Sequence, residues 1–445
     1  MAKLYAGVSA VNITPPVGID LTGFAGRPSP AIGIHDDLYA KCLVMDDGTE
    51  KIGILTMDLL GLDSDIVERV REEVEDKLGV PSRCLMLSTS HTHSGPATIS
   101  LRGLGKRDEV YVEELTRKLI GAVKMAFDSV RPAKVGFGTG QVQIGINRRQ
   151  RLKTGAMAIG QNPSGPVAPY VDVMRVDDES GRPMAVLFSH AAHPVVLGGK
   201  NLLVSADYPG YAMRLVERIE GCVAMFAQGC CGDVNSNPVG RTFEDARRLG
   251  TILGGHTIGV AESIRCSDDD VRLKAISRKI ELPLQDPLPP EETSRLVIEY
   301  RERLEEAKRR GEHRGQIYLH EGMLGWAEDM DKLASSGKTG LTKGFEIQAI
   351  RITERAVILG MAGEVFVDYQ IDLKRRSPYE MTMVFAYTNG CIGYVPTADA
   401  YPEGGYEVDM AYKYYGTLML KPESDGIIRD EALKMLREMR EESHL

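Results

Sequence analysis

The stretch CLMLSTSHTHSGP, residues 84–96, contains the pattern from which the fold can be derived. It begins with a short, continuously apolar run at 84–87 and changes at once to small, polar and histidine residues. Short apolar runs of this kind are typical of strands that are buried on both faces of a sheet. The stretch therefore predicts a buried strand whose carboxyl end carries polar side chains, two histidines among them.

Five further runs have the same character, and amphipathic segments lie between several of them. Apolar residues recur at helical spacing over 66–78, which Gly79 would end, over 115–127, and in a third helix that we expect to begin after Pro209. This alternation predicts an α/β fold with a mixed β-sheet core layered with helices, in one domain over 1–445. The other apolar runs are 52–57, 185–188, 222–227, 356–361 and 381–387.

Residues 287–342 differ from the rest of the chain because they are highly charged and helical in pattern. We interpret them as a helical hairpin inserted between β-rich parts. Such a charged hairpin is a solvated surface decoration in the simplest interpretation. The functional alternatives are a lid over a cleft and a contact between subunits of a homo-oligomer.

Composition narrows the class of protein. The net charge of −9 does not favour nucleic-acid binding, which needs a basic surface. No stretch approaches the roughly 20 apolar residues of a membrane helix, and the amino terminus lacks the apolar core of a signal peptide. The seven cysteines are odd in number and scattered, as is typical of reduced thiols. We therefore expect a cytoplasmic protein with a small-molecule substrate and no membrane or nucleic-acid partner.

Polar side chains gather where the predicted strands end. Four of the nine histidines, at 91, 93, 190 and 193, follow two of these strands, and Glu364 follows another. Ligands of α/β proteins bind in the crevice beyond the carboxyl ends of strands, and histidine with carboxylate is the usual ligand set of catalytic zinc. In an extended backbone, His91 and His93 would point to one face. The sequence thus predicts a metal site at this edge, with zinc, manganese or iron open.

Several motifs occur in one order along the chain, and together they carry a family resemblance. On these motifs the sequence resembles the catalytic domain of the neutral (non-lysosomal) ceramidase family. The motifs are AGVSAVNITP at 6–15, HTHSGP at 91–96, INR at 146–148, HP at 193–194, SADYPGYA at 205–212, GDV at 232–234, GE at 363–364, GYVPT at 393–397 and YE at 406–407.

The resemblance implies a site and a reaction. It implies a Zn²⁺-dependent hydrolase that cleaves an amide-type (N-acyl) or related ester bond by means of a metal-activated water. Donors near the metal would stabilise the oxyanion that forms or protonate the leaving nitrogen. The implied zinc ligands are His91, His193, Glu364 and Tyr394, and the implied catalytic residues are His93, Arg148, Asn235 and Tyr406.

Two departures from the family pattern shape the expected substrate. The family's G-D-V-S-P-N has a serine where this chain has Asn235, unless an insertion lets Ser236 take that place. Because the sequence ends at Leu445, we also expect the chain to lack the family's additional C-terminal β-domain, and we expect no secretion signal. Both departures lead us to expect a substrate smaller and more polar than ceramide, in a cytoplasmic relative.

Other interpretations stay open at this point. Cys230 or Cys231 could act as a nucleophile with His93 or His190 as base. The chain could instead be a non-catalytic metal- or carbohydrate-binding relative, or it could catalyse another metal-assisted reaction such as epimerisation or elimination. Further polar residues near strand ends could support ligand histidines or the cleft. They are Asp207 and Asp233, with weaker claims for Asp36, Asp37 and Asp58.

Overall fold

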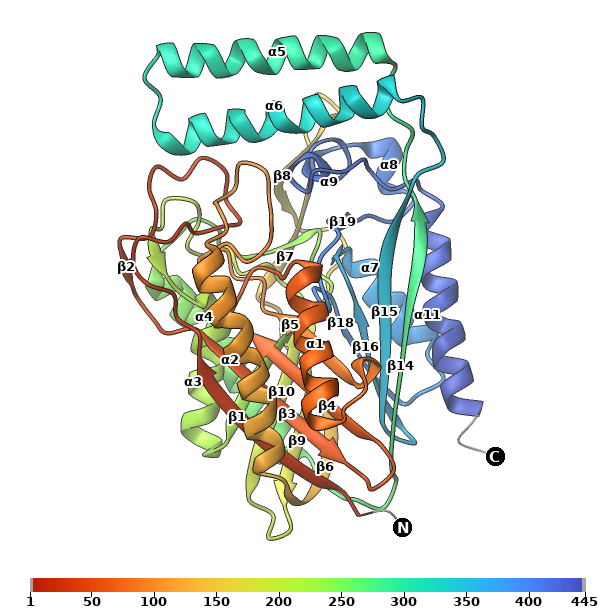
Figure 1. Cartoon of the computed structure of the whole chain (residues 1–445). Coiled ribbons are helices and arrows are strands. Elements are labelled where there is room, and N and C mark those ends of the chain that lie inside the picture. The colour runs from red at the N-terminus through yellow and green to blue at the C-terminus, as the bar shows by residue number, and fades with distance from the viewer. Residues whose placement is uncertain (1–2, 442–445) are drawn as a thin grey trace.

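The computed structural model describes residues 3–441 and has the α/β architecture expected from the sequence (Figure 1). Its largest sheet has eight strands in the order β12-β10-β9-β6-β1-β3-β4-β5. These strands are β1 (Tyr5–Asn12), β3 (Tyr39–Asp46), β4 (Lys51–Met57), β5 (Leu85–Thr89), β6 (Arg131–Gln141), β9 (Tyr170–Asp178), β10 (Pro183–His190) and β12 (Val223–Gln228).

A second sheet and three small ones complete the β structure. The second sheet has the order β14-β15-β16-β18, and the three-stranded sheet has the order β13-β7-β8. Their strands are β14 (Val271–Pro283), β15 (Thr342–Thr353), β16 (Ala356–Met361), β18 (Met381–Phe385), β13 (Val234–Ser236), β7 (Gly145–Arg151) and β8 (Met157–Asn162). The two-stranded pairs are β2 (Gly33–Ile34) with β11 (Leu203–Val204), and β17 (Glu364–Val365) with β19 (Tyr394–Val395).

The six apolar runs correspond to β4, β5, β10, β12, β16 and β18, so all six predicted strands are confirmed. They form three parallel pairs, β4–β5, β10–β12 and β16–β18, each with a helix between its two strands in the chain. Those helices are α1 (Ser64–Leu78), α3 (Asp207–Glu220) and α7 (Val367–Arg376). The carboxyl ends of these three β-α-β units carry the polar turns singled out in the sequence.

Burial on both faces explains why the runs are continuously apolar. Along β10, Val186 and Phe188 enter one apolar core, while Ala185 and Leu187 enter the other. Successive side chains of a strand point to opposite faces, so a strand between two cores needs an apolar residue at every position. The remaining strands pair mostly antiparallel, and several of them, such as β1, β6 and β14, carry exposed positions, so the pattern of apolar runs did not reveal them.

The predicted helices are confirmed, with one shifted start. Gly79 ends α1 in the left-handed conformation, with φ 66°, and its N–H donates to Glu75. The helix α3 begins at Asp207 rather than after Pro209. Proline is compatible with a first helical turn because its missing N–H would have no partner there. Four further helices are α2 (Glu109–Asp128), α4 (Phe243–Ser263), α10 (Ala411–Tyr414) and α11 (Ser424–Glu441).

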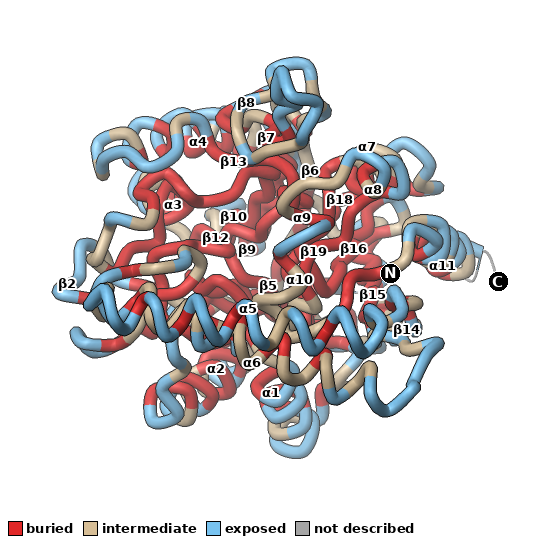
Figure 2. Tube along the Cα trace, turned by 90° about the horizontal axis from the view of Figure 1, so that it is seen from above, coloured by how far each residue is buried: buried red, intermediate tan, exposed pale blue. Residues whose placement is uncertain are grey.

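The charged insertion forms the expected helical hairpin, α5 (Pro290–Arg309) and α6 (Arg314–Ser335). Figure 1 shows α5 outermost and α6 beneath it, above the short helices α8 (Ala400–Glu403) and α9 (Tyr406–Asp409). Seen from above, α5 and α6 cross a molecule whose centre is buried (Figure 2). Between residues 3 and 441, no helix combines the length and apolar character that a bilayer span requires.

Helix α6 is packed against the body of the protein, so it is not a solvated decoration. Arg314 pairs with Asp20 at 2.7 Å, and Trp326 donates to the carbonyl of Thr417 at 3.0 Å. Gly315 sits so close to the segment below that a Cβ there would lie 1.8 Å from the carbonyl oxygen of Arg27. The hairpin is therefore fixed to the loops that lie over the strand ends.

Gly315→Ala is expected to destabilise the protein by about 1–3 kcal/mol, because the added methyl group must push α6 away from Arg27. Gly255, on the exposed side of α4, is the matched control, since a Cβ there meets nothing within 4 Å. Gly255→Ala should be neutral or stabilising by up to about 1 kcal/mol. Urea denaturation measures both, and equal stabilities for the two variants would contradict close packing of α6.

Candidate metal centre

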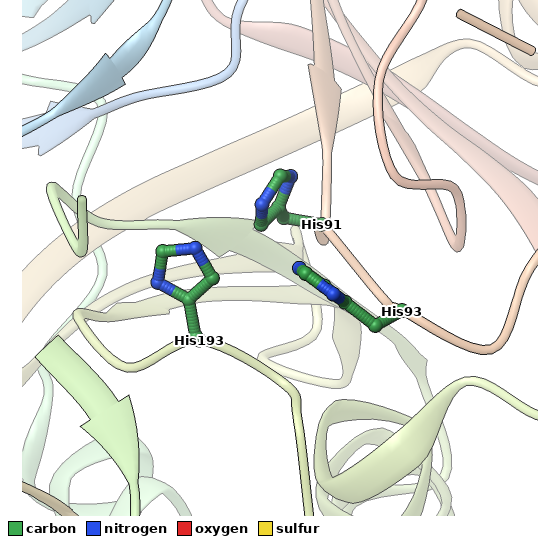
Figure 3. Close-up of side chains that lie close together, drawn as sticks. All are labelled: His91, His93 and His193. Atoms are coloured by element: carbon green, nitrogen blue, oxygen red, sulfur yellow. The ribbon is translucent and has the colours of Figure 1, made fainter. Parts of the chain in front are cut away.

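Three histidines converge at the carboxyl ends of β5 and β10 (Figure 3). His91 and His93 follow β5, and His193 follows β10. The ring centroids are 4.9 Å apart for His91–His93, 4.8 Å for His91–His193 and 5.6 Å for His93–His193. One nitrogen from each ring lies within 4.8 Å of the others, so the three side chains could together hold a metal ion.

Backbone carbonyls orient two of the rings. Nδ1 of His91 lies 2.7 Å from the carbonyl oxygen of Leu60, and Nδ1 of His193 lies 2.6 Å from that of Cys231. Each ring therefore turns its Nε2 toward the carboxylate of Glu364, at 3.3 Å for His91 and 3.1 Å for His193. A carbonyl on one ring nitrogen and a free second nitrogen is the usual arrangement of a metal-ligating histidine.

The backbone at His91 is left-handed, with φ 63°, and not extended. The expectation that H-x-H lies on one face of an extended strand is therefore wrong, because β5 ends at Thr89 and the chain turns. A side chain held at positive φ is strained, and such strain is concentrated at functional sites. Tyr387, also left-handed with φ 54°, stacks on the His91 ring with centroids 4.0 Å apart.

Glu364 and Tyr394 lie side by side because β17 and β19 pair in parallel at these two residues. Tyr394 is turned to Arg148, whose Nη2 donates to the phenol oxygen at 2.8 Å. The second carboxylate oxygen of Glu364 accepts a hydrogen bond from the phenol of Tyr415 at 2.5 Å. Tyr415 was not singled out from the sequence, since it lies in an irregular segment after α10 that shows no periodic pattern.

Tyr415→Phe is expected to weaken metal binding about 10- to 100-fold, because Glu364 loses the hydrogen bond that fixes its orientation. The matched control is Tyr414→Phe, a neighbouring tyrosine that is half-buried like Tyr415 but is not the one that bonds to Glu364. Competition with a fluorescent zinc chelator measures both affinities. Equal affinities for the two variants would show that Tyr415 does not orient the carboxylate.

Arg148 joins the predicted catalytic residues. Besides Tyr394, its guanidinium donates from Nη1 to the side-chain oxygen of Asn235 at 3.2 Å, and it lies 5.9 Å from the ring centre of Tyr406. Asn235 and Ser236 are successive residues of β13, so their side chains point to opposite faces. Asn235, and not Ser236, therefore lies beside Arg148.

The site has the chemistry that a cation requires. Burial, followed by the proximity of His91 and His193, holds the pKa of His93 well below its usual range, and burial lowers the pKa of His193 to about 4. Neutral imidazoles are the form that binds metal. Within residues 3–441, Nε2 of His91 and both ring nitrogens of His93 are buried without a hydrogen-bond partner. A bound cation would satisfy such orphaned acceptors and the buried Glu364 carboxylate.

Comparisons with known proteins agree with this site. Residues 5–252 match the family model described as neutral/alkaline non-lysosomal ceramidase, N-terminal, which is more than half of the chain. The chain belongs to the neutral ceramidase family. The match includes His91, His93, His193, Arg148 and Asn235, while Glu364, Tyr394 and Tyr406 lie beyond it.

Individual relatives match about half of this chain in sequence, and one solved structure matches nearly the whole fold. Neutral ceramidase B of Dictyostelium discoideum is 28% identical over 254 residues, 51% of this chain and 34% of that protein. The neutral ceramidase of Pseudomonas aeruginosa is 23% identical over 272 residues, 55% of this chain and 40% of that protein. The match thus spans little more than a third of these relatives. The Pseudomonas aeruginosa crystal structure superposes with a TM-score of 0.74 at 17% identity, covering 99% of this chain and 75% of that one.

In this ceramidase-family chain, His91 and His193 are not supported by Asp207 or Asp233, which the sequence offered as possible partners of the histidines. Both imidazoles bond to backbone carbonyls instead. Asp233 accepts from Asn147 and from the N–H of Val367, each at 2.8 Å. The remaining aspartates also have other partners: Asp207 accepts from the N–H of Tyr208, Asp36 from Ser205, Asp37 from Thr14 and Asp58 from the N–H of Tyr39.

The two adjacent cysteines are poorly suited to act as nucleophiles. Cys230 and Cys231 are fully buried, and burial raises the pKa of both thiols well above the usual range. The thiolate is the nucleophilic form, so a buried thiol of raised pKa is inert. His190, one suggested base, has its Nδ1 at 2.8 Å from the carbonyl oxygen of Tyr170. The geometry therefore favours the metal centre over a cysteine mechanism.

Proposed function

We propose that this chain is a zinc-dependent hydrolase that cleaves an amide-type (N-acyl) or related ester bond of a small, polar substrate. The observation that carries the proposal is the convergence of His91, His193 and Glu364, because the Nε2 atoms of both histidines face the same carboxylate oxygen. Two imidazoles and a carboxylate are a usual donor set for catalytic zinc, and the relatives are named as ceramidases, which act on an amide bond.

The zinc ion, when bound, supplies a Lewis acid that polarises the scissile carbonyl and lowers the pKa of water. The remaining tasks belong to the chain. His93 lies beside the two ligand rings with both nitrogens free of protein partners, so it can take a proton from water and return it to the leaving nitrogen. Arg148 places two N–H groups at the site, where they can stabilise negative charge on the carbonyl oxygen.

Polar groups near the metal centre support a polar substrate. The side chains around the donor set include Arg148, Asn235, Tyr394 and Tyr406. Asn235 and Tyr394 bond to Arg148, whose guanidinium has five N–H donors, more than its bonds to Glu407, Asn235 and Tyr394 use. The remaining donors need hydrogen-bond partners when a substrate excludes water, and an alkyl chain offers none. We therefore propose that the group next to the scissile bond carries hydrogen-bonding atoms, as in an N-acyl amino acid or an N-acyl amino sugar.

A substrate panel with metal control tests this function. Purified protein is incubated with a short-chain ceramide, N-acyl amino acids, N-acyl amino sugars and matched esters, before chelation, after it and after zinc is restored. We expect turnover of a polar N-acyl compound that chelation abolishes and zinc restores. Turnover that resists chelation but not iodoacetamide would favour a cysteine nucleophile. Bound zinc without turnover of any compound would favour a binding protein.

A further inference from the structure

Glu407 is a buried carboxylate that joins two neighbouring arginines of β7. It lies in the first turn of α9 and is 1% exposed. One carboxylate oxygen accepts from Nε of Arg148 at 2.8 Å, and the other accepts from Nη1 of Arg149 at 2.9 Å. A carboxylate can be buried at this depth only when it is paired, and here each oxygen has its own guanidinium.

The pairing determines which edge of the Arg148 guanidinium faces the metal centre. Glu407 occupies Nε, so Nη1 and Nη2 are left to point to Asn235 and Tyr394, at 3.2 and 2.8 Å. An arginine fork that is held along one edge loses little conformational freedom when its other edge binds a ligand. The carboxylate therefore presets the two N–H groups that Arg148 directs into the site.

Arg149 secures the turn from which Glu407 comes. Its Nη2 donates to the carbonyl of Gly404 at 2.9 Å, one turn before α9. Gly404 and Gly405 both have positive φ, 67° and 100°, so the chain bends sharply there before Tyr406 and Glu407. The bend at Gly404 and Gly405 and the hydrogen bond from Arg149 together hold α9 against β7. Tyr406, the first residue of α9, lies near Arg148 in the site.

We propose that Glu407 is a positioning residue for catalysis: it anchors Arg148 through Nε so that both Nη groups face the reacting carbonyl. This assignment rests on the proposed function. It adds Glu407 as a residue that acts only through Arg148. Glu403 provides a contrast. It ends the preceding helix α8 and binds Nη2 of Arg149 at 3.2 Å and Arg151 at 2.7 Å. Its carboxylate is exposed, and these bonds go to Arg149 and Arg151 and not to Arg148.

Kinetics of Glu407→Gln and Glu403→Gln on a substrate that the wild type cleaves test the assignment. We expect Glu407→Gln to lower kcat about 10²-fold with KM changed by less than about 3-fold, since the donors act mainly on the transition state. Bound zinc should equal that of the wild type. Glu403→Gln should stay within about 3-fold of the wild type. Equal losses in both variants, or loss of zinc from Glu407→Gln, would overturn the assignment.

Crystal structures of the same variants separate this proposal from the proposed function. In Glu407→Gln the Arg148 guanidinium should leave Tyr394 or Asn235, whereas in Glu403→Gln it should keep both contacts. An unmoved Arg148 in Glu407→Gln would overturn the proposal, even if the wild type cleaves no compound tested. If Glu407→Gln does not fold, Glu407→Asp keeps the charge but shortens the anchor. That variant should show the same displacement, and an unmoved Arg148 there would overturn the proposal equally.

Discussion

Replacing His91 and His193 together with alanine is expected to weaken zinc binding by at least about 10³-fold and to abolish hydrolysis. The reason is that two of the donors around Glu364 disappear at once. Structural zinc sites bind with roughly 10–16 kcal/mol, so losing two of the three proposed ligands removes at least on the order of 5 kcal/mol. Zinc affinity is measured by chelator competition, and turnover is measured on the same samples.

The matched control for this double variant is His190→Ala. His190 is also buried at the carboxyl end of β10, but its Nδ1 faces the carbonyl of Tyr170 and it is not one of the three converging histidines. It should lose stability yet keep zinc. If the double variant retained wild-type zinc affinity while folded, the histidines would not be the ligands.

His93→Ala is expected to lower kcat about 10²- to 10⁴-fold while zinc remains bound, which is the range typical of a lost general acid–base group. His93 makes no side-chain hydrogen bond within the described residues, so its removal should disturb the fold little. Its ring packs edge-on against Phe24 at 4.9 Å, and its carbonyl accepts from Arg27 at 2.5 Å. Kinetics and metal content, measured on the same preparation, distinguish a proton-carrying role of His93 from a metal-ligating one.

The metal content is decisive here because all three histidine rings lie close enough to share one ion. A loss of zinc comparable with that of the double variant would make His93 a ligand instead of a proton carrier. Retained zinc with wild-type kcat would exclude both roles.

The sequence predicted the β-α-β units well because their strands are buried on both faces. A strand such as β16 is apolar at all six positions, so its pattern is visible without any knowledge of its neighbours. By contrast, β14 mixes buried and exposed positions along thirteen residues. The pattern of such an antiparallel strand depends on which of its positions the neighbouring elements cover. The parallel pair of β2 and β11 is too short for any pattern, since each strand contains two residues.

The candidate site was predicted where its residues directly follow a buried strand. His91, His193 and Glu364 could be found in this way, because the carboxyl ends of neighbouring strands meet at one edge. Residues whose position depends on distant packing could not be found. Tyr415 and Glu407 come from irregular carboxyl-terminal segments, and only the folded chain brings them to Glu364 and Arg148.

We propose that His91, His193 and Glu364 hold a catalytic metal in this ceramidase-family chain. The zinc content of the purified wild-type protein tests this assignment, measured by mass spectrometry after equilibration with zinc and removal of the excess, beside the His91→Ala/His193→Ala variant. We expect about one zinc ion per wild-type chain, as for a mononuclear site, and none in the folded variant. A wild type that holds no zinc after reconstitution, or a variant that holds as much, would contradict it.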